Sequence, residues 1–410
     1  MKLDIDFVRA QFPALSGEWI YMDNAGGSQT LKQVISRIGE YLTTSDVQLG
    51  ATYDISQLGV KRVTEAARSI AELINAENES EVILGSSTSM LLRVLSHCLV
   101  ETFKPGDEVI VTNCDHEANI GPWADMEKKG INVKVWHINP ETLELHLEDL
   151  APLMNEKTRL VALTHASNIL GTLNPIKEIA SFVHERGAKI CVDGVAHAPH
   201  RLVDVKELDV DFYAFSFYKV YGPHYAVLYG KKAHLLELPG WNHFFIGKED
   251  VPLKFQPGGI NFELSYSLLG VCDYLSEVAK KHAEGQPPQG LKDSAALAYR
   301  CFAEHEETLS TTLLDYLNGK SNVRIIGKKE AGRNVRVPTI SFMVDDMKSS
   351  SITEQVDKHK IGIRFGHFYA KRLIDDLGLA PRDGVVRVSM VHYNTVEEVE
   401  KLIRAFDNIF

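Results

Sequence analysis

Two short apolar runs in this chain are each followed by a residue with an ionisable side chain that could act in catalysis. Residues 211–217 are rich in aromatic side chains, which predicts a buried strand, and Lys219 follows before Gly222 and Pro223. Residues 188–192 form an earlier apolar run that ends at Asp193. If these strands are neighbours, a carboxylate and an amine lie at the same carboxyl edge of one sheet.

A lysine at the end of a buried strand is costly unless it is paired or covalently engaged. Burial lowers the pKa of the amine, so that it can attack an aldehyde and then carry protons. Pyridoxal phosphate needs both groups, because a carboxylate keeps its pyridine nitrogen protonated and a lysine binds its aldehyde. The alternative is a strand-end lysine that simply reaches water, and Asp193 argues against it.

Composition narrows the class of protein. A chain of 410 residues with 44% apolar and 24% charged residues predicts a globular protein of two domains. The net charge is −11 without a basic run, which argues against nucleic acid. No signal core or membrane-spanning run is present, and five scattered cysteines indicate reduced thiols. We therefore expect a cytoplasmic protein.

Several motifs together resemble the class V aminotransferase family, in particular its cysteine desulfurase and selenocysteine lyase branch. They are residues 21–25 (Tyr-Met-Asp-Asn-Ala), 192–194, 216–223, 386–389 and 393–395. The resemblance implies a fold type I α/β enzyme that binds pyridoxal 5'-phosphate, with a mostly parallel, seven-stranded sheet in the large domain. We place the large domain at 16–264 and the small domain at 1–15 and 265–410, with helix 265–281 as the passage between them.

The cofactor phosphate needs an anion site. Residues 80–85 predict a strand and 90–95 a helix, with Ser86, Ser87 and Thr88 between them. Hydroxyl residues at a helix start are most often N-caps, but free N–H groups and the helix dipole also attract anions. The resemblance favours the phosphate. It also implies a homodimer, in which the turn around Gly259 completes the phosphate site of the neighbouring subunit.

The resemblance implies the other cofactor contacts as well. It places His116 against the pyridine ring and Asn168 at the phenolic oxygen, with Ser216 and Tyr218 beside Lys219. The plainer interpretations are a loop histidine and an Asx turn. Cys114, Asp115 and His116 could suggest a metal site, but the sequence offers no further ligand at zinc spacing, so we expect no metal there.

Substrate contacts follow from the same resemblance. Arg387 would hold the α-carboxylate with its two-pronged guanidinium, and Arg364 is the next candidate. An edge arginine exposed to solvent is the alternative for Arg387. The turn at Asn24 and Ala25 would approach the substrate through its backbone, since glycines follow it.

Four positions depart from the family pattern. Tyr369 stands where desulfurases carry the persulfide cysteine, and no cysteine follows Cys301. Tyr218 replaces a phosphate-binding histidine, and Gly259 replaces a threonine. Ala196 replaces a glutamine, for which the adjacent His197 could partly compensate.

These residues predict a pyridoxal-phosphate enzyme acting on a small amino acid. Lys219 would deprotonate Cα with the help of Asp193 and His116, and Tyr369 would donate a proton or shape the pocket. We expect a carbon–sulfur lyase that eliminates sulfur from cysteine, cystine or a cysteine conjugate. Open alternatives are a persulfide-type desulfurase with another acceptor, an aminotransferase, an epimerase of the isopenicillin N type, and a non-catalytic cofactor-binding scaffold.

Overall fold

A sheet organises the larger part of the molecule. The computed structural model describes residues 2–410, and within them seven strands form one sheet in the order β2-β8-β7-β6-β5-β3-β4. β8 is antiparallel to both of its neighbours and the other adjacent pairs are parallel. The strands are β2 (Val82–Gly85), β3 (Glu108–Thr112), β4 (Asn132–Trp136), β5 (Thr158–Thr164), β6 (Lys189–Asp193), β7 (Phe212–Ser216) and β8 (Ala226–Gly230). The predicted α/β fold with a mostly parallel sheet is confirmed.

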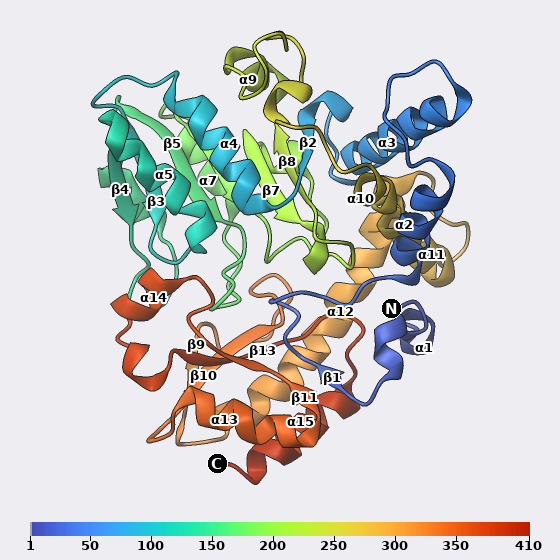
Figure 1. Cartoon of the computed structure of the whole chain (residues 1–410). Coiled ribbons are helices and arrows are strands. Elements are labelled where there is room, and N and C mark those ends of the chain that lie inside the picture. The colour runs from blue at the N-terminus through green and yellow to red at the C-terminus, as the bar shows by residue number, and fades with distance from the viewer. Residues whose placement is uncertain (1) are drawn as a thin grey trace.

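Both faces of this sheet are covered, as its apolar strands require. In β5, Leu160 and Ala162 belong to one buried cluster, and Val161 and Leu163 belong to another on the opposite face. Helix α4 packs into the first cluster and α7 into the second (Figure 1). The helices of this part are α2 (Lys32–Thr44), α3 (Asp54–Leu73), α4 (Thr88–Val100), α5 (Gly121–Ala124), α6 (Leu147–Leu150), α7 (Ile176–His184), α8 (Val205–Leu208), α9 (Lys232–Glu237), α10 (Phe262–Ser267) and α11 (Leu269–His282).

A second, antiparallel sheet lies below the first in Figure 1, in the order β12-β13-β10-β9. Its strands are β9 (Val323–Ile326), β10 (Thr339–Val344), β12 (Arg364–Gly366) and β13 (Val385–Ser389), with helices α13 (Ser349–Val356), α14 (Lys371–Asp376) and α15 (Val396–Asp407). Thr395 and Glu398 form the predicted capping box of α15.

One long helix joins the two parts. α12 (Leu291–Asn318) contributes Ala298 and Phe302 to the core under the large sheet, and Leu309 and Leu313 to the core of the small sheet. The sequence analysis predicted helix 265–281 as this passage. In the structure that segment divides into α10 and α11, and α12 contributes residues to both cores. The domain bounds, including the one at residue 265, stay a prediction.

The N-terminal segment also reaches the small sheet. Helix α1 (Ile5–Arg9) precedes β1 (Ile20–Tyr21), which pairs in parallel with β11 (Ile361–Gly362). The backbone N–H of Asn24 donates to the carbonyl of Ser389 at 3.1 Å. Residues 20–24, which the prediction assigns to the large domain, thus contact the small sheet directly.

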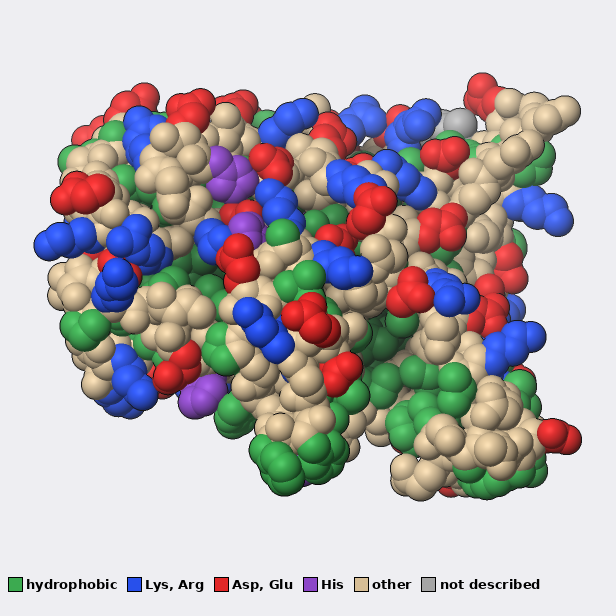
Figure 2. Space-filling view, turned by 90° about the horizontal axis from the view of Figure 1, so that it is seen from above, with side chains coloured by type: hydrophobic (Ala, Val, Ile, Leu, Met, Phe, Trp, Pro, Cys, Tyr) green, Lys and Arg blue, Asp and Glu red, His purple; other side chains and the backbone are tan. Residues whose placement is uncertain are grey.

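The surface carries charges of both signs. Figure 2 shows acidic and basic side chains interspersed over one face, together with gathered apolar side chains at its edge. Phe244 is fully exposed, Phe245 is largely exposed and Trp241 is partly exposed. Among residues 2–410, no helix has the length and apolar character needed to cross a membrane.

Candidate active site

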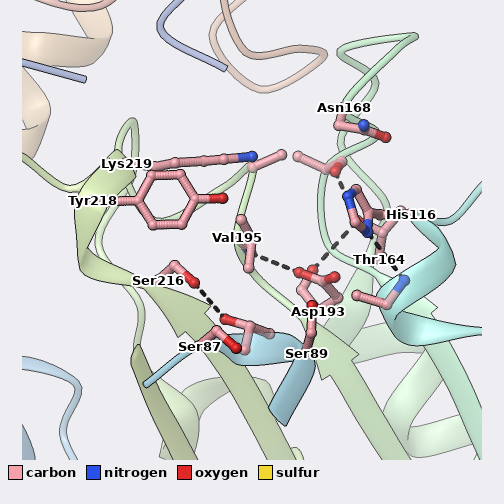
Figure 3. Close-up of a pocket in the computed structure, with 14 residues that line it drawn as sticks. Ser87, Ser89, His116, Thr164, Asn168, Asp193, Val195, Ser216, Tyr218 and Lys219 are labelled. Atoms are coloured by element: carbon pink, nitrogen blue, oxygen red, sulfur yellow. Dashed lines mark hydrogen bonds between the residues drawn. The ribbon is translucent and has the colours of Figure 1, made fainter. Parts of the chain in front are cut away.

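A cavity with about 510 Å³ of empty space opens at the carboxyl edge of the large sheet (Figure 3). Its walls come from the ends of β5, β6 and β7, from the start of α4 and from the loop after β3. The lining residues are Ser87, Thr88, Ser89, His116, Ala118, Thr164, Ala166, Asn168, Asp193, Val195, Ala196, Ser216, Tyr218 and Lys219. Eight of the site residues predicted from the sequence therefore share one cavity.

Asp193 and Lys219 lie on neighbouring strand ends, as the sequence analysis expected. β6 pairs with β7 in parallel, with Asp193 opposite Ala214, and Lys219 follows β7 in a short 3-10 turn. Burial lowers the pKa of Lys219 to about 8, the charge of Arg387 adds to this, and Asp193 opposes it. An amine with this pKa is partly neutral near pH 7, as a nucleophile and base must be.

The carboxyl group of Asp193 is almost fully buried. Its Oδ1 accepts a hydrogen bond from the backbone N–H of Val195 at 2.8 Å. Burial raises the pKa of Asp193, while the Val195 N–H and the charge of Lys219 lower it. A buried carboxylate gains from a cationic partner, and a protonated ring nitrogen would supply one.

The first turn of α4 closes one end of the cavity. Ser87 is the N-cap, and its Oγ accepts from the N–H of Met90 at 3.2 Å. The hydroxyls of Thr88 and Ser216 lie 2.7 Å apart and join this turn to the end of β7. Hydroxyls and free N–H groups at a helix N-terminus suit a phosphate.

His116 forms another wall. Its Nδ1 accepts from the backbone N–H of Ala118 at 3.0 Å, which leaves the proton of the neutral ring on Nε2. Burial lowers the pKa of His116 to about 4, and the charges of Lys219 and Arg387 add to the effect. The imidazole is thus neutral at pH 7 and can lie flat against an aromatic ring.

A loop from the small sheet reaches the mouth of the cavity. The Tyr369 ring lies 5.2 Å from the His116 ring at an angle of 32°, and the Tyr369 carbonyl accepts from the Glu117 N–H at 2.8 Å. The Asn168 side-chain N–H donates to the carbonyl of Phe368 at 2.8 Å. In this conformation the Asn168 amide holds the loop, a contact that the sequence analysis did not anticipate.

Ser86, an expected phosphate residue, does not line this cavity. It lines a neighbouring cavity with about 690 Å³ of empty space, together with Met90, Asn261 and Gly259, the residue expected to act in the phosphate site of the neighbouring subunit. Gly259 has a φ of +85°, in the region that favours glycine. His197 does not reach the cavity beside Ala196, because it stacks on His165 at 3.5 Å in the interior.

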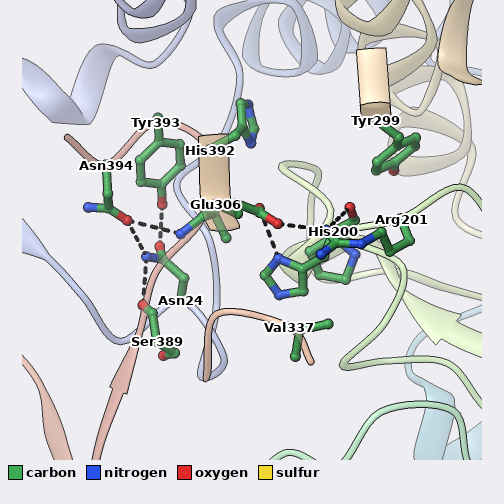
Figure 4. A network of polar contacts seen from close by, with 12 residues as sticks. Asn24, His200, Arg201, Tyr299, Glu306, Val337, Ser389, His392, Tyr393 and Asn394 are labelled. Carbon is green, nitrogen blue, oxygen red and sulfur yellow. Dashed lines mark hydrogen bonds and ion pairs between the residues drawn. The ribbon is translucent and has the colours of Figure 1, made fainter. Parts of the chain in front are cut away.

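The Asn24 turn is engaged inside the protein. Figure 4 shows the Asn24 side chain in a buried network with Ser389, Tyr393 and Asn394. The backbone N–H of Ala25 donates to the Ser389 hydroxyl at 2.9 Å. This turn therefore anchors the N-terminal segment, and neither Asn24 nor Ala25 lines the cavity.

Arg387 is buried rather than at an exposed edge, with only 2% of its side chain accessible. Its Nη2 contacts Asp23 Oδ1 at 3.0 Å and its Nη1 donates to the Asn168 carbonyl at 3.1 Å. The Phe368 ring centroid lies 3.7 Å from the guanidinium carbon. The sequence analysis quoted Asp23 within a motif but assigned it no role, and it did not single out Phe368.

No cluster of metal-binding side chains occurs within residues 2–410, so the Cys114–His116 segment shows no further ligand. The Asp115 carboxylate instead accepts from Asn119 Nδ2 at 2.6 Å and from the Thr164 N–H at 3.0 Å. These bonds tie the segment that carries His116 to the end of β5.

The sequence matches the family model described as aminotransferase class-V over residues 20–287 and 290–402. The chain belongs to the class V aminotransferase family. It is 44% identical to the aminotransferase-like protein FGM3 of Gibberella zeae, over 100% of this chain and 99% of that protein. It is 34% identical to the cysteine desulfurase-like protein ustD of Aspergillus flavus, over 99% and 91% of the two chains.

A solved structure agrees with this placement in the class V family. The cysteine desulfurase of Thermococcus onnurineus superimposes with a TM-score of 0.86 at 25% identity, covering 100% of this chain and 98% of that chain. Class V aminotransferases are pyridoxal-phosphate enzymes of fold type I, so this chain is a lyase or transferase that uses this cofactor. The cavity fits the group: it offers a buried amine, a buried carboxylate, a neutral imidazole and a helix N-terminus with hydroxyls.

Proposed function

We propose that this enzyme is a carbon–sulfur lyase that removes the β-sulfur of cysteine, cystine or a cysteine conjugate. Cysteine and water would give pyruvate, ammonia and hydrogen sulfide. The observation that carries the proposal is Tyr369, whose ring lies 5.2 Å from that of His116 and which the sequence resemblance assigns to the position of the desulfurase persulfide cysteine. A phenol is a poor acceptor of sulfur, whereas a thiolate is a good one.

The thiols of this chain support the same conclusion. All five cysteines are buried, and burial raises the pKa of each. A buried thiol with a raised pKa is a weak nucleophile and cannot reach the substrate. Sulfur should therefore leave as a small molecule.

The proposed roles of the residues follow from their positions. Bound pyridoxal phosphate supplies the electron sink that makes the Cα–H bond acidic. Lys219 takes the Cα proton, Asp193 keeps the ring nitrogen protonated, and His116 packs against the ring. Ser87, Thr88 and Ser216 hold the phosphate, with Tyr218 beside them. Arg387 binds the α-carboxylate, and the Tyr369 hydroxyl protonates the departing sulfur.

Product analysis tests the proposal. Purified enzyme with bound cofactor is incubated with cysteine, cystine and S-alkyl cysteines. Alanine, pyruvate and sulfide are quantified, and the mass of the protein is measured by mass spectrometry. We expect pyruvate and sulfide without a change in protein mass. Alanine together with a persulfide on any cysteine would instead establish a desulfurase. Inversion at Cα alone would indicate an epimerase, and bound cofactor without turnover would indicate a scaffold.

Transamination is the second candidate, because the chain is 44% identical to a protein named aminotransferase-like. It would leave the cofactor in its aminated form and release a 2-oxo acid that retains the sulfur. The same incubations distinguish the two reactions, since aminated cofactor absorbs at shorter wavelength and no sulfide appears.

We also propose a cytoplasmic homodimer. Exposed aromatic residues such as Phe244 and Phe245 supply apolar surface for a partner. The cavity that Ser86 and Gly259 line is a place where one subunit could complete the phosphate site of the other. Light scattering of the purified protein tests the dimer, and cell fractionation tests the location.

A further inference from the structure

Arg387 and Asp23 form an ion pair at a place where the proposed substrate carboxylate must bind. Arg387 lies on β13 and donates to the carbonyl of Asn168, which lines the cavity, and the backbone of Asp23 bridges to Ser389 on the same strand. The Arg387 charge lowers the pKa of both Lys219 and His116, so it acts directly on the cavity.

We infer that Asp23 is an internal counter-ion of Arg387 which the substrate carboxylate displaces, and that Arg364 receives the displaced side chain. This inference rests on the proposed binding of the α-carboxylate by Arg387. In addition to that proposal, Asp23 sets the affinity of Arg387 for the substrate carboxylate. Arg364 acts indirectly, by binding Asp23 once it is displaced.

The donors of Arg387 make Asp23 a competitor of the substrate carboxylate. A carboxylate binds a guanidinium at two points either through both Nη atoms or through Nε and Nη2. Both arrangements use an N–H group of Nη2, and Nη2 already contacts Asp23 Oδ1. Nη1 donates to the Asn168 carbonyl, and Nε has no hydrogen-bond partner within residues 2–410. A substrate carboxylate on Nε and Nη2 would satisfy Nε and would be repelled by the charge of Asp23 unless that side chain moved away.

Asp23 is placed to move. Its side chain is 28% accessible, whereas that of Arg387 is 2% accessible. The backbone on either side is held, because the N–H of Met22 donates to the Gly362 carbonyl at 2.9 Å and the side chain of Asn24 belongs to the buried network of Figure 4. Movement can therefore be confined to rotation of the Asp23 side chain.

Arg364 offers the alternative partner. It lies opposite Arg387 in the β12–β13 pairing, and its Nη1 is 3.6 Å from Asp23 Oδ2. Its side chain is 56% accessible, so it can follow the carboxylate. Two arginines and one aspartate carry one net positive charge, which a substrate carboxylate neutralises.

Chemical rescue tests the inference without relying on turnover. The Tm is measured for the holoenzymes of the parent, Asp23→Ala and Asp23→Asn at increasing concentrations of sodium propionate. Sodium chloride at the same ionic strength serves as the salt control. Glu40→Gln is the control, because Glu40 pairs with the buried Arg62 and neither residue lines the cavity. We expect propionate to raise the Tm of both Asp23 variants in a saturable way, and to act on the parent and the control only at higher concentration.

Steady-state kinetics provide the second readout. Removing the competing carboxylate in Asp23→Asn should lower the KM for the amino acid by about tenfold, as expected from a charged hydrogen bond, with little change in kcat. Arg364→Gln should raise KM in the parent but not in the Asp23→Asn background, because Arg364 acts through Asp23.

The outcomes separate this inference from the proposed function. Propionate rescue of the Asp23 variants without cysteine turnover would support the counter-ion and reject the lyase. Equal propionate responses in all four proteins, or an unchanged or raised KM in Asp23→Asn, would overturn the inference and leave Asp23 as a structural ion pair. An equal effect of Arg364→Gln in both backgrounds would show that Arg364 binds the substrate directly.

Discussion

The hydroxyls of Thr88 and Ser216 lie 2.7 Å apart and connect the first turn of α4 to the end of the strand that precedes Lys219. Both side chains line the cavity. The contact therefore couples the proposed phosphate site to the position of the lysine. Substituting either residue should weaken binding of the cofactor.

We expect Ser216→Ala to bind pyridoxal phosphate roughly 2–10-fold more weakly, as loss of one hydrogen bond predicts. Titration of cofactor-free protein, followed by tyrosine and tryptophan fluorescence, measures this. The double variant with Thr88→Val should lose less than the sum of the two single effects, because the hydroxyls are partners. Strict additivity would mean that they act independently.

Lys219→Ala should lose the visible absorbance of the lysine-bound cofactor. Turnover should fall by more than the roughly 10²–10⁴-fold typical of one acid–base group, because binding and proton transfer are lost together. Absorbance spectra and product assays measure the two effects separately. A variant with near-normal rate would show that another group carries the proton.

Asp193→Asn should retain the cofactor but exchange the substrate Cα proton at least about tenfold more slowly, since an amide does not raise the pKa of the ring nitrogen. Deuterium uptake at Cα, followed by NMR, reports this step alone. Exchange as fast as in the parent would remove Asp193 from the mechanism.

The contribution of Lys219 to the stability of the cofactor-free protein should rise with pH between about 8 and 10.5. Burial lowers the pKa of Lys219 to about 8, so over this range this lysine binds a proton in the unfolded chain and not in the folded one. Its contribution therefore increases as pH rises, by up to about 3 kcal/mol. The five buried thiols, whose pKa is raised, act in the opposite direction in the parent and in Lys219→Met alike. Denaturant unfolding at several pH values should therefore show a stability difference between the parent and Lys219→Met that moves in favour of the parent as pH rises, and a constant difference would contradict this assignment.

Tyr369→Cys should convert part of the turnover to a persulfide route. The position is exposed and its side chain lies over His116, so a thiol there can reach the cavity mouth. We expect a sulfur adduct on the protein and some alanine, both detectable by mass spectrometry. Tyr369→Phe is the matched control, and it should form no adduct while sulfide release slows.

The sequence alone indicated that Asp193 and Lys219 each follow a buried strand, because a strand and the polar residue at its end depend on local pattern. The same holds for the capping box at Thr395 and for the hydroxyls that begin α4. Each of these features involves residues close along the chain, whose backbone conformation is set by near neighbours. The pairing of β6 with β7, which brings Asp193 and Lys219 to one edge, is seen only in the structure.

Only the tertiary structure decided the partners of Arg387. Asp23 lies far from Arg387 in sequence, and the bridge between Asp23 and Ser389 on β13 brings them together. The contact of Asn168 with Phe368 and the contribution of α12 to two separate cores also depend on the packing of segments that are distant in sequence. Local pattern predicts which groups reach a sheet edge, but the packing of distant segments decides which hydrogen bonds and charges those groups share.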